Sequence, residues 1–360
     1  MARVRVTALG EATSLADRKR RAGHRLLVSP GGTGASVDLR ALLRTFVPAG
    51  FVLGPGDLVE PDQVRDLLSD LAARVHARTP PLAVLGAVRG GLAALPAPAT
   101  PWPAAAVLGH AGDPDLTRAV ARALGSEAAT LGFHAIFSPW LGLPRGGPED
   151  EASYGSDPEA VARHAEAAVR GFDEAGILSF VGPFPGAAPP GAAAVERDRG
   201  EVEAEDLVPF RAVRDAAAGV ILSGVCWPAW DPDRPAWGSA ALVSELLKDL
   251  LGYPGLAIAP DLGALLGAEP ADRVVADLVA AGVDLVPCSA DPAVEVALWE
   301  ALVRAQEDDP AIDRAFEEAD RRLDRARAQA FRPRAQGGLG ALGAPEYRGL
   351  AHEVRARGER

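Results

Sequence analysis

The chain has 360 residues, which suits one large domain or two small ones with a substantial buried core. Hydrophobic residues make up 48% and charged residues of both signs 24%, a globular composition that argues against intrinsic disorder. The net charge of −12 argues against nucleic acid or an anionic membrane as a partner.

Cysteine and lysine usage narrows the class further. Two cysteines, Cys226 and Cys288, cannot build a disulfide framework or a cysteine zinc site, and we expect neither a metal nor another cofactor. Neither lysine, Lys19 or Lys248, lies at a strand end, so Schiff-base enzymes fit poorly. With no apolar run near the ~20 residues of a membrane span and no apolar secretory core at the start, we expect a cytoplasmic protein.

Short apolar runs alternate with longer helical patterns along the chain. The predicted strands are residues 24–29, 50–53, 82–85, 133–137, 177–181, 218–223, 256–259 and 283–287. The predicted helices are residues 61–77, 115–131, 158–175, 209–217, 239–251 and 270–281. Apolar residues recur in these helices at three- and four-residue spacing, which indicates one buried face.

The repeated strand–helix order predicts a parallel sheet with right-handed crossovers. Eight strands over roughly 260 residues match an α/β TIM (β/α)8-type barrel in number and span. A doubly wound open sheet is the competing architecture, and the even repetition favours the barrel. We therefore predict a single-domain barrel over 23–330, an N-terminal extension over 1–22 and a C-terminal tail over 331–360.

Two segments fall outside the pattern. Residues 183–200 are rich in Pro, Gly and Ala and predict a long loop after the fifth strand. Residues 310–330 predict a charged helix, and the tail beyond it is expected to be a loose, surface-bound extension.

A glycine-rich turn, GGTGAS at residues 31–36, follows the first strand and precedes a helical pattern. Its backbone amides could hold a phosphate group. Val37 replaces the third glycine of the dinucleotide fingerprint, and only Asp57 is available as a ribose-binding acid. A tight turn is the favoured interpretation, and a nucleotide-binding protein stays an alternative.

Motifs at the strand ends form an ordered series. They are RGGLAALP (89–96), FSPWLG (137–142), SYGSDPEAVARHAEAAVRGFDEAGI (153–177), GPFPG (182–186), DLVPFRA (206–212), LGYPGLAIAPDL (251–262) and AAGVDLVPCS (280–289). The series resembles glycoside hydrolase family 3, in its single-domain β-N-acetylhexosaminidase branch. The resemblance implies a TIM barrel that hydrolyses glycosides with retention, through an aspartate nucleophile and a histidine–aspartate acid/base.

The resemblance places the nucleophile at the end of the seventh strand, in a Ser-Asp-Asp-Leu-like motif. This chain reads APDL there, so Pro260 stands at the position of the attacking carboxylate and Asp261 is its acidic neighbour. Asp261 is either a shifted nucleophile or a group that hydrogen-bonds the local backbone. The second interpretation is favoured, because adjacent strand residues point to opposite faces.

The acid/base loop is also changed. The family's Asp-x-His dyad falls near residues 197–201, where Asp198 corresponds to the aspartate and Gly200 to the histidine. Glu201 could transfer a proton, but a solvated loop charge in an acidic run is favoured. Sugar-binding polar positions of the family read here as Ala87, Gly142, Ala152, Gly182, Ala187 and Gly224.

These losses predict a pseudo-glycosidase that acts as a binding or scaffold barrel. The alternative is an active glycosidase with relocated carboxylates such as Asp261 and Glu201. Arg89, Trp140, Arg145, Trp227 and Asp261 are expected to line the mouth of the barrel, where tryptophans could stack on a saccharide or anchor a protein partner. The competing interpretations are that the tryptophans fill core volume and that the arginines form structural ion pairs.

Overall fold

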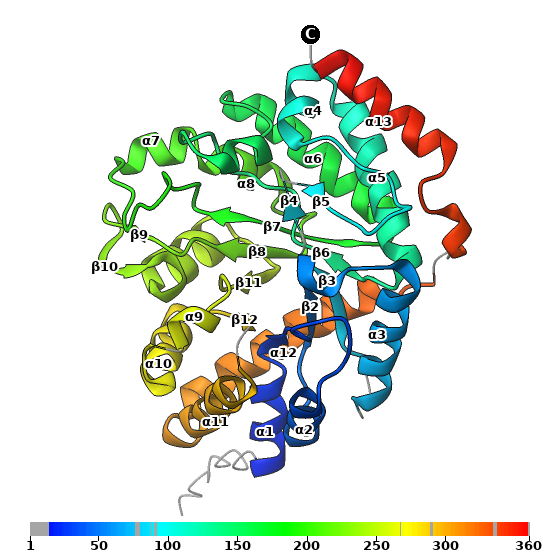
Figure 1. Ribbon diagram of the computed structural model, residues 1–360. Helices are drawn as coiled ribbons and strands as arrows, with labels where there is room; N and C mark the ends of the chain where they lie inside the picture. The colour runs from blue at the N-terminus through cyan, green and yellow to red at the C-terminus, as the bar shows by residue number, and fades with distance from the viewer. Residues whose placement is uncertain are drawn as a thin grey trace, which may run out of the picture.

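The computed structural model describes residues 14–75, 80–86, 88–89, 92–266, 268–288, 291–333 and 337–358. Its central feature is a parallel sheet in the order β11-β8-β7-β6-β3-β2-β1-β12 (Figure 1). The strands are β1 (Leu26–Val28), β2 (Gly50–Leu53), β3 (Leu82–Leu85), β6 (Ala135–Ile136), β7 (Leu178–Phe184), β8 (Gly219–Leu222), β11 (Leu256–Ile258) and β12 (Val286–Cys288). Each overlaps one of the eight predicted strands, and β2 and β3 match end for end.

The two outer strands of the sheet meet. Ala259 N donates to Leu285 O at 2.9 Å, and Asp284 N donates to Ala257 O at 2.8 Å. Ile258 and Leu285 also form a parallel bridge. The sheet is therefore a nearly closed barrel of the TIM type, as predicted, and the doubly wound alternative is wrong.

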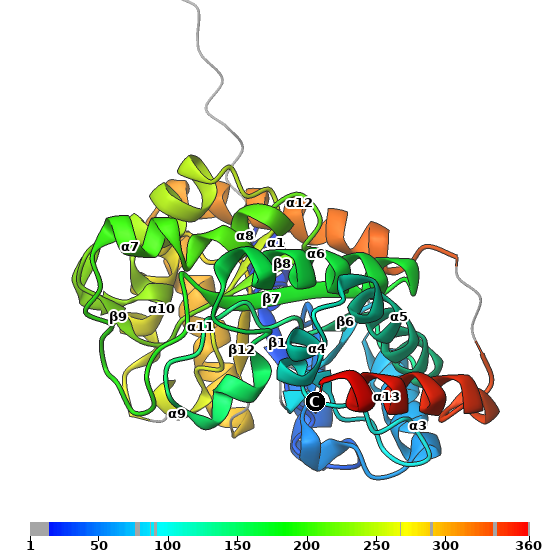
Figure 2. The same ribbon diagram turned by 90° about the horizontal axis from the view of Figure 1, so that it is seen from above.

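Helices surround the barrel (Figure 2). They are α1 (Leu15–Gly23), α2 (Val37–Thr45), α3 (Pro61–Arg74), α4 (Ala105–Ala111), α5 (Pro114–Leu131), α6 (Pro158–Glu174), α7 (Arg199–Ala204), α8 (Leu207–Val213), the π-helix η4 (Ala241–Leu250), α9 (Gly263–Leu266), α10 (Ala271–Ala281), α11 (Pro292–Asp308), α12 (Pro310–Ala330) and α13 (Pro345–Gly358). The helices α5, α6, α11 and α12 each begin with an Asp-Pro pair, in which the aspartate caps free amides and proline fills the first turn.

Short elements complete the described fold. Two hairpins pair β4 (Val88–Arg89) with β5 (Leu92–Ala93) and β9 (Cys226–Trp227) with β10 (Asp231–Pro235). Single turns are η1 (Pro55–Asp57), η2 (Pro148–Ala152), η3 (Ala236–Gly238) and η5 (Leu339–Ala341). Among the helices of the described residues, none is both long and apolar enough to cross a bilayer.

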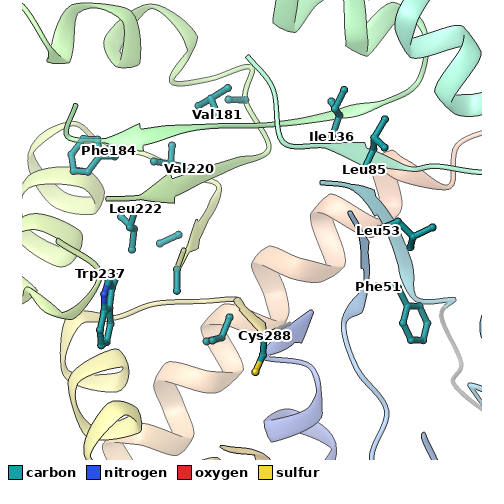
Figure 3. Packing of buried hydrophobic residues seen from close by; sticks show 14 of the residues in the cluster. Phe51, Leu53, Leu85, Ile136, Val181, Phe184, Val220, Leu222, Trp237 and Cys288 are labelled. Atoms are coloured by element: carbon teal, nitrogen blue, oxygen red, sulfur yellow. The ribbon is translucent and has the colours of Figure 1, made fainter. Parts of the chain in front are cut away.

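Buried apolar side chains form two layers because neighbouring strand residues face opposite sides. In β1, Leu26 and Val28 face the surrounding helices and Leu27 faces the barrel interior. Figure 3 shows part of the outer layer, with Phe51 and Leu53 of β2 near Leu85 of β3. The inner layer is closed below by apolar side chains of α12.

The helix α12 covers the N-terminal ends of the strands with buried ion pairs. Asp284, at the entrance to β12, is 1% exposed and lies 2.8 Å from Arg322 Nη2 and 3.3 Å from Lys248 Nζ. Burial opposes ionisation of Asp284, but these two cations outweigh it and lower its pKa. Arg25 and Asp320 form a second pair, and Arg327 Nη2 donates to Ala49 O at 3.0 Å.

The C-terminal tail is folded, so the expectation of a loose extension is wrong for residues 337–358. Helix α13 lies against α4 and α5 (Figures 1 and 2). Gly343 N donates at 2.8 Å to Glu127, a 1% exposed carboxylate that also accepts from Thr100 N and Trp102 Nε1. Ala351 and Val354 are buried, which gives the tail an apolar attachment.

One further boundary differs from the sequence expectation, and one stays open. The predicted loop 183–200 begins later, because β7 continues through Phe184, and ends where α7 starts at Arg199. The predicted N-terminal extension contains α1, which packs against α11 and α12. Residues 1–13 lie outside the described residues, so the boundary at residue 22 stays a prediction.

Candidate functional site

A cavity of about 450 Å³ opens at the C-terminal ends of the strands, where TIM barrels bind their ligands. It is lined by Leu27, Ser29, Val52, Gly54, Pro55, Gly86, Phe137, Ile221, Ala259, Pro260, Asp261, Pro287 and Cys288. These residues come from the ends of seven of the eight strands. Apart from Ser29, Asp261 and Cys288, the lining residues are apolar or are glycines. None of the lining residues in the described chain is basic.

The end of β11 gives this cavity one carboxylate. Pro260 lines the wall, where its ring has no ionisable group. Asp261 is exposed at the rim, and its Oδ1 accepts a hydrogen bond from Gly263 N at 2.9 Å. The local backbone contact that the sequence favoured for Asp261 is therefore present.

A buried carboxyl group close to Asp261 was missed in the sequence. Glu295, in the first turn of α11, is 1% exposed, and its Oε1 has no hydrogen-bond partner in the described part of the chain. Burial, followed by the charges of Asp261 and Asp291, raises the pKa of Glu295 to about 8. The side chain is therefore mostly protonated at neutral pH.

The spacing along α11 was the signal that could have identified it. Glu295 stands three residues before Leu298 and seven before Leu302, and both leucines are buried. A glutamate on the buried face of a helix needs either a partner or a proton.

Cys288 is the third titratable group at this place in the described chain. Burial, followed by the charges of Glu295 and Asp261, raises the pKa of its thiol to about 12. The thiol is therefore protonated and unreactive at neutral pH. Across the described residues, no group of three or more His, Cys, Asp or Glu side chains has the arrangement of a metal site.

Asp198 and Glu201 are not among the residues that line this cavity, and they lie at the start of α7, which Figure 1 labels. Asp198 caps that helix by accepting from Gly200 N at 2.7 Å. Glu201 accepts from Asp198 N at 3.3 Å and lies 3.8 Å from Arg197 Nε. The two carboxylates thus form a helix cap rather than part of the cavity wall.

The aromatic and basic residues expected at the mouth are dispersed. Trp140 and Arg145 border a separate, very small hollow, and Arg145 Nη2 lies 2.6 Å from the buried carboxylate of Asp206. Trp227 is fully buried. Arg89 belongs to β4, but its side chain lies outside the described residues.

The glycine-rich turn is tied to the neighbouring loop by Asp57. This buried carboxylate accepts from Gly32 N at 2.6 Å and from Gly54 N at 2.7 Å. The acid considered for ribose binding therefore holds the turn's own backbone. Ser36 caps α2, and nothing in this geometry favours nucleotide binding.

Comparisons with known proteins agree with the fold and the motifs. The glycosyl hydrolase family 3 N terminal domain matches residues 32–325. A beta-hexosaminidase of Pseudomonas aeruginosa is 27% identical over 297 residues, which are 76% of this chain and 85% of that protein. Another beta-hexosaminidase, from Nitrosomonas eutropha, is 29% identical over 254 residues, covering 66% of this chain and 72% of that protein.

Solved structures give the same fold. A glycoside hydrolase family 3 beta-N-acetylglucosaminidase from Paenibacillus superposes with a TM-score of 0.84 at 28% identity, covering 94% of this chain and 68% of that chain. NagZ from Neisseria gonorrhoeae, solved with N-trifluoroacetyl-D-glucosamine, superposes with a TM-score of 0.74 at 21% identity, covering 93% of this chain and 98% of that chain. At that identity the second likeness supports the fold alone.

Proposed function

Because the chain belongs to glycosyl hydrolase family 3, we propose that it keeps the barrel of a β-hexosaminidase without its double-displacement chemistry, and that its mouth binds a ligand without cleaving it. The observation that carries this proposal is the cavity wall. Among its lining residues Asp261 supplies the one carboxylate, and a proline occupies the neighbouring position at the end of β11.

Retaining hydrolysis needs an attacking group and a proton donor on opposite sides of the scissile bond, and where both are carboxyl groups they lie about 5–5.5 Å apart. One attacks the sugar, and the other protonates the leaving oxygen. Asp198 and Glu201 are engaged in capping α7 and do not line the cavity. Glu295 is close to Asp261, but it is 1% exposed and is not among the residues that line the cavity, so it does not reach a glycosidic oxygen there. The cavity therefore offers an attacking group or a proton donor, but not both.

One observation supports a second candidate, an active glycosidase with relocated carboxylates. A general acid must be protonated at the working pH, and the raised pKa of Glu295, about 8, meets that condition beside Asp261. A movement of α11 that brought Glu295 to the cavity would recreate a pair of carboxyl groups.

Turnover of 4-nitrophenyl N-acetyl-β-D-glucosaminide distinguishes the two functions. We expect the wild-type rate to equal the buffer rate, and Asp261→Asn and Glu295→Gln to leave it there, because losing both catalytic groups costs many orders of magnitude. Asp215→Asn, an exposed carboxylate paired with Arg214, is the matched control. Saturable turnover that survives in Asp215→Asn but disappears in Asp261→Asn would overturn the proposal.

A further inference from the structure

We propose that the ligand of the mouth cavity is a small, uncharged molecule with a mainly apolar body and one oxygen atom that accepts a hydrogen bond from Ser29. The inference rests on the proposed function, because it treats the cavity as a binding site and not as a site of hydrolysis. It goes further by naming the chemical class of the ligand.

Half-buried apolar side chains from three different strands face the cavity. Val52 of β2, Phe137 just after β6 and Ile221 of β8 line it and pack against the inner layer of the barrel core. Fully buried Leu27 of β1 lines it as well. Contact between such apolar surface and water is unfavourable, and a ligand that covers the surface removes that contact. The wall therefore favours a ligand with an apolar body.

The dimensions of the cavity fit a small molecule. Its volume of about 450 Å³ lies within the usual range for small-molecule sites, roughly 300–1,000 Å³. Its lining residues come from the ends of seven of the eight strands. A ligand here would therefore be surrounded by the barrel and would bury most of its own surface.

The polar groups of the wall favour a ligand without charge. Apart from Asp261, whose Oδ1 accepts a hydrogen bond from Gly263 N at 2.9 Å, the described lining residues have no charged side chain. Burial raises the pKa of the Cys288 thiol to about 12, so this group is neutral too. A carboxylate or an ammonium group placed against Val52 and Phe137 would lose its hydration without gaining an ion pair.

Ser29 supplies a hydrogen-bond donor on this wall. It follows β1, where the alternation of side chains puts it on the same inner face as Leu27. Its Oγ accepts from Gly31 N at 3.3 Å, and none of the described residues accepts the hydrogen of its hydroxyl group. That hydrogen is available for a hydroxyl or carbonyl oxygen of a ligand. A single donor on an apolar wall fixes the orientation of what binds there.

A saccharide matches this wall less well. Its hydroxyl groups project from every side of the ring, and those that face Val52, Phe137 and Ile221 would lose hydrogen bonds to water without gaining a partner. A ligand with one oxygen atom avoids most of this cost.

Titration calorimetry with probes of one shape tests the ligand class. We expect 1-adamantanol to bind at least tenfold more tightly than 1-adamantanecarboxylate and 1-adamantylammonium, which share its apolar cage but are charged at pH 7. N-acetylglucosamine, a neutral ring with several hydroxyl groups, should show no saturable binding. The heat capacity change for 1-adamantanol should be negative, because apolar surface leaves water on binding.

Two valines provide a blocking variant and its matched control. Val52→Trp places a large ring in the cavity and is expected to abolish saturable binding of 1-adamantanol. Val59→Trp makes the same change at a 60% exposed residue that does not line the cavity, and it should keep wild-type affinity. Urea denaturation of both variants shows whether they are folded.

Ser29 is tested by variants that add little bulk. Ser29→Ala removes the donor and is expected to weaken 1-adamantanol binding about fivefold, which corresponds to the loss of one hydrogen bond. Ser29→Thr keeps the hydroxyl group and should restore affinity to within about twofold of the wild type.

Binding of either charged probe that equals or exceeds that of 1-adamantanol would overturn the inference. The same holds for 1-adamantanol binding that persists in folded Val52→Trp or is unchanged in Ser29→Ala, and for its absence in the wild type. Saturable binding of N-acetylglucosamine without cleavage would overturn the inference but still support the proposed function. Glycoside turnover that depends on Asp261 would instead overturn the proposed function, whatever the probes do.

Discussion

The two ends of the barrel surround a buried carboxyl group with charges of opposite sign. At the N-terminal end, Asp284 is 1% exposed and ionised, because Lys248 and Arg322 surround it. At the mouth, Glu295 is equally buried but has acidic neighbours, and it keeps a proton instead. Burial opposes ionisation of both carboxyl groups. The cations beside Asp284 outweigh it and lower the pKa of that group, whereas the acidic neighbours of Glu295 raise its pKa further.

This difference distinguishes the end of the barrel that stabilises the fold from the end that contains the cavity. Paired charges under α12 tie the last helix of the barrel to the strands, which is a contribution to stability. The mouth contains instead a largely apolar cavity, with the protonated carboxyl group of Glu295 buried close to Asp261. In TIM barrels, residues at the N-terminal end serve stability and those at the C-terminal end serve function, so the mouth is where a new ligand would be accommodated.

The largest expected effect comes from removing the buried acid at the N-terminal end. Asp284→Ala leaves Lys248 and Arg322 without their partner and removes the hydrogen bond from Ala257 N at 2.9 Å. We expect unfolding free energy to fall by about 3–5 kcal/mol in urea denaturation at pH 7. Asp261→Ala at the mouth should cost no more than about 0.5 kcal/mol. Similar losses in the two variants would remove the contrast between the ends.

A smaller, pH-dependent effect is expected from the buried acid at the mouth. Glu295 has a folded-state pKa of about 8 against an ordinary value of 4.5, so between those values the unfolded chain releases a proton that the folded chain keeps. Raising the pH therefore destabilises the wild type by about 1.4 kcal/mol per unit, which gives roughly 3 kcal/mol between pH 5 and pH 8. Glu295→Gln does not lose stability in this way, because glutamine does not titrate.

Urea denaturation of the wild type and Glu295→Gln across that pH range measures the difference. The free energy of unfolding of Glu295→Gln, relative to that of the wild type, should increase steadily up to pH 8 and stay constant above it. Glu300→Gln, on the exposed face of the same helix, should follow the wild type at every pH. A pH-independent difference between the wild type and Glu295→Gln would mean that Glu295 is ionised throughout, and the contrast between the two ends would fail.

Much of the barrel could be predicted from sequence, because its signals are local. Strands β2 and β3 are four-residue apolar runs, and their ends are marked by glycine or proline. The Asp-Pro pairs that begin α6 and other helices combine a cap with a first-turn proline. The tail was harder, since α13 buries few residues and Gly343, just before it, is held by Glu127, which lies more than 200 residues earlier.

The site was less predictable, because it depends on which distant residues the fold brings together. Trp227 follows a strand, as a mouth residue would, yet it is fully buried. Asp57 looked like a candidate ribose ligand but holds the backbone of its own turn. Glu295 belongs to an ordinary helical pattern, and its closeness to Asp261 and Cys288 follows only from the closure of β11 against β12.

Intact-mass spectrometry after incubation with 5-fluoro-N-acetyl-β-D-glucosaminyl fluoride tests most directly whether the mouth has given up double displacement. The reagent accumulates as a covalent glycosyl adduct wherever a carboxylate attacks the sugar, because the fluorine slows the second step. An active family 3 hexosaminidase treated in parallel should gain one sugar. We expect the wild-type form of this protein, in contrast, to keep its unmodified mass. A stoichiometric adduct that maps to Asp261 and is absent from Asp261→Asn would contradict this account.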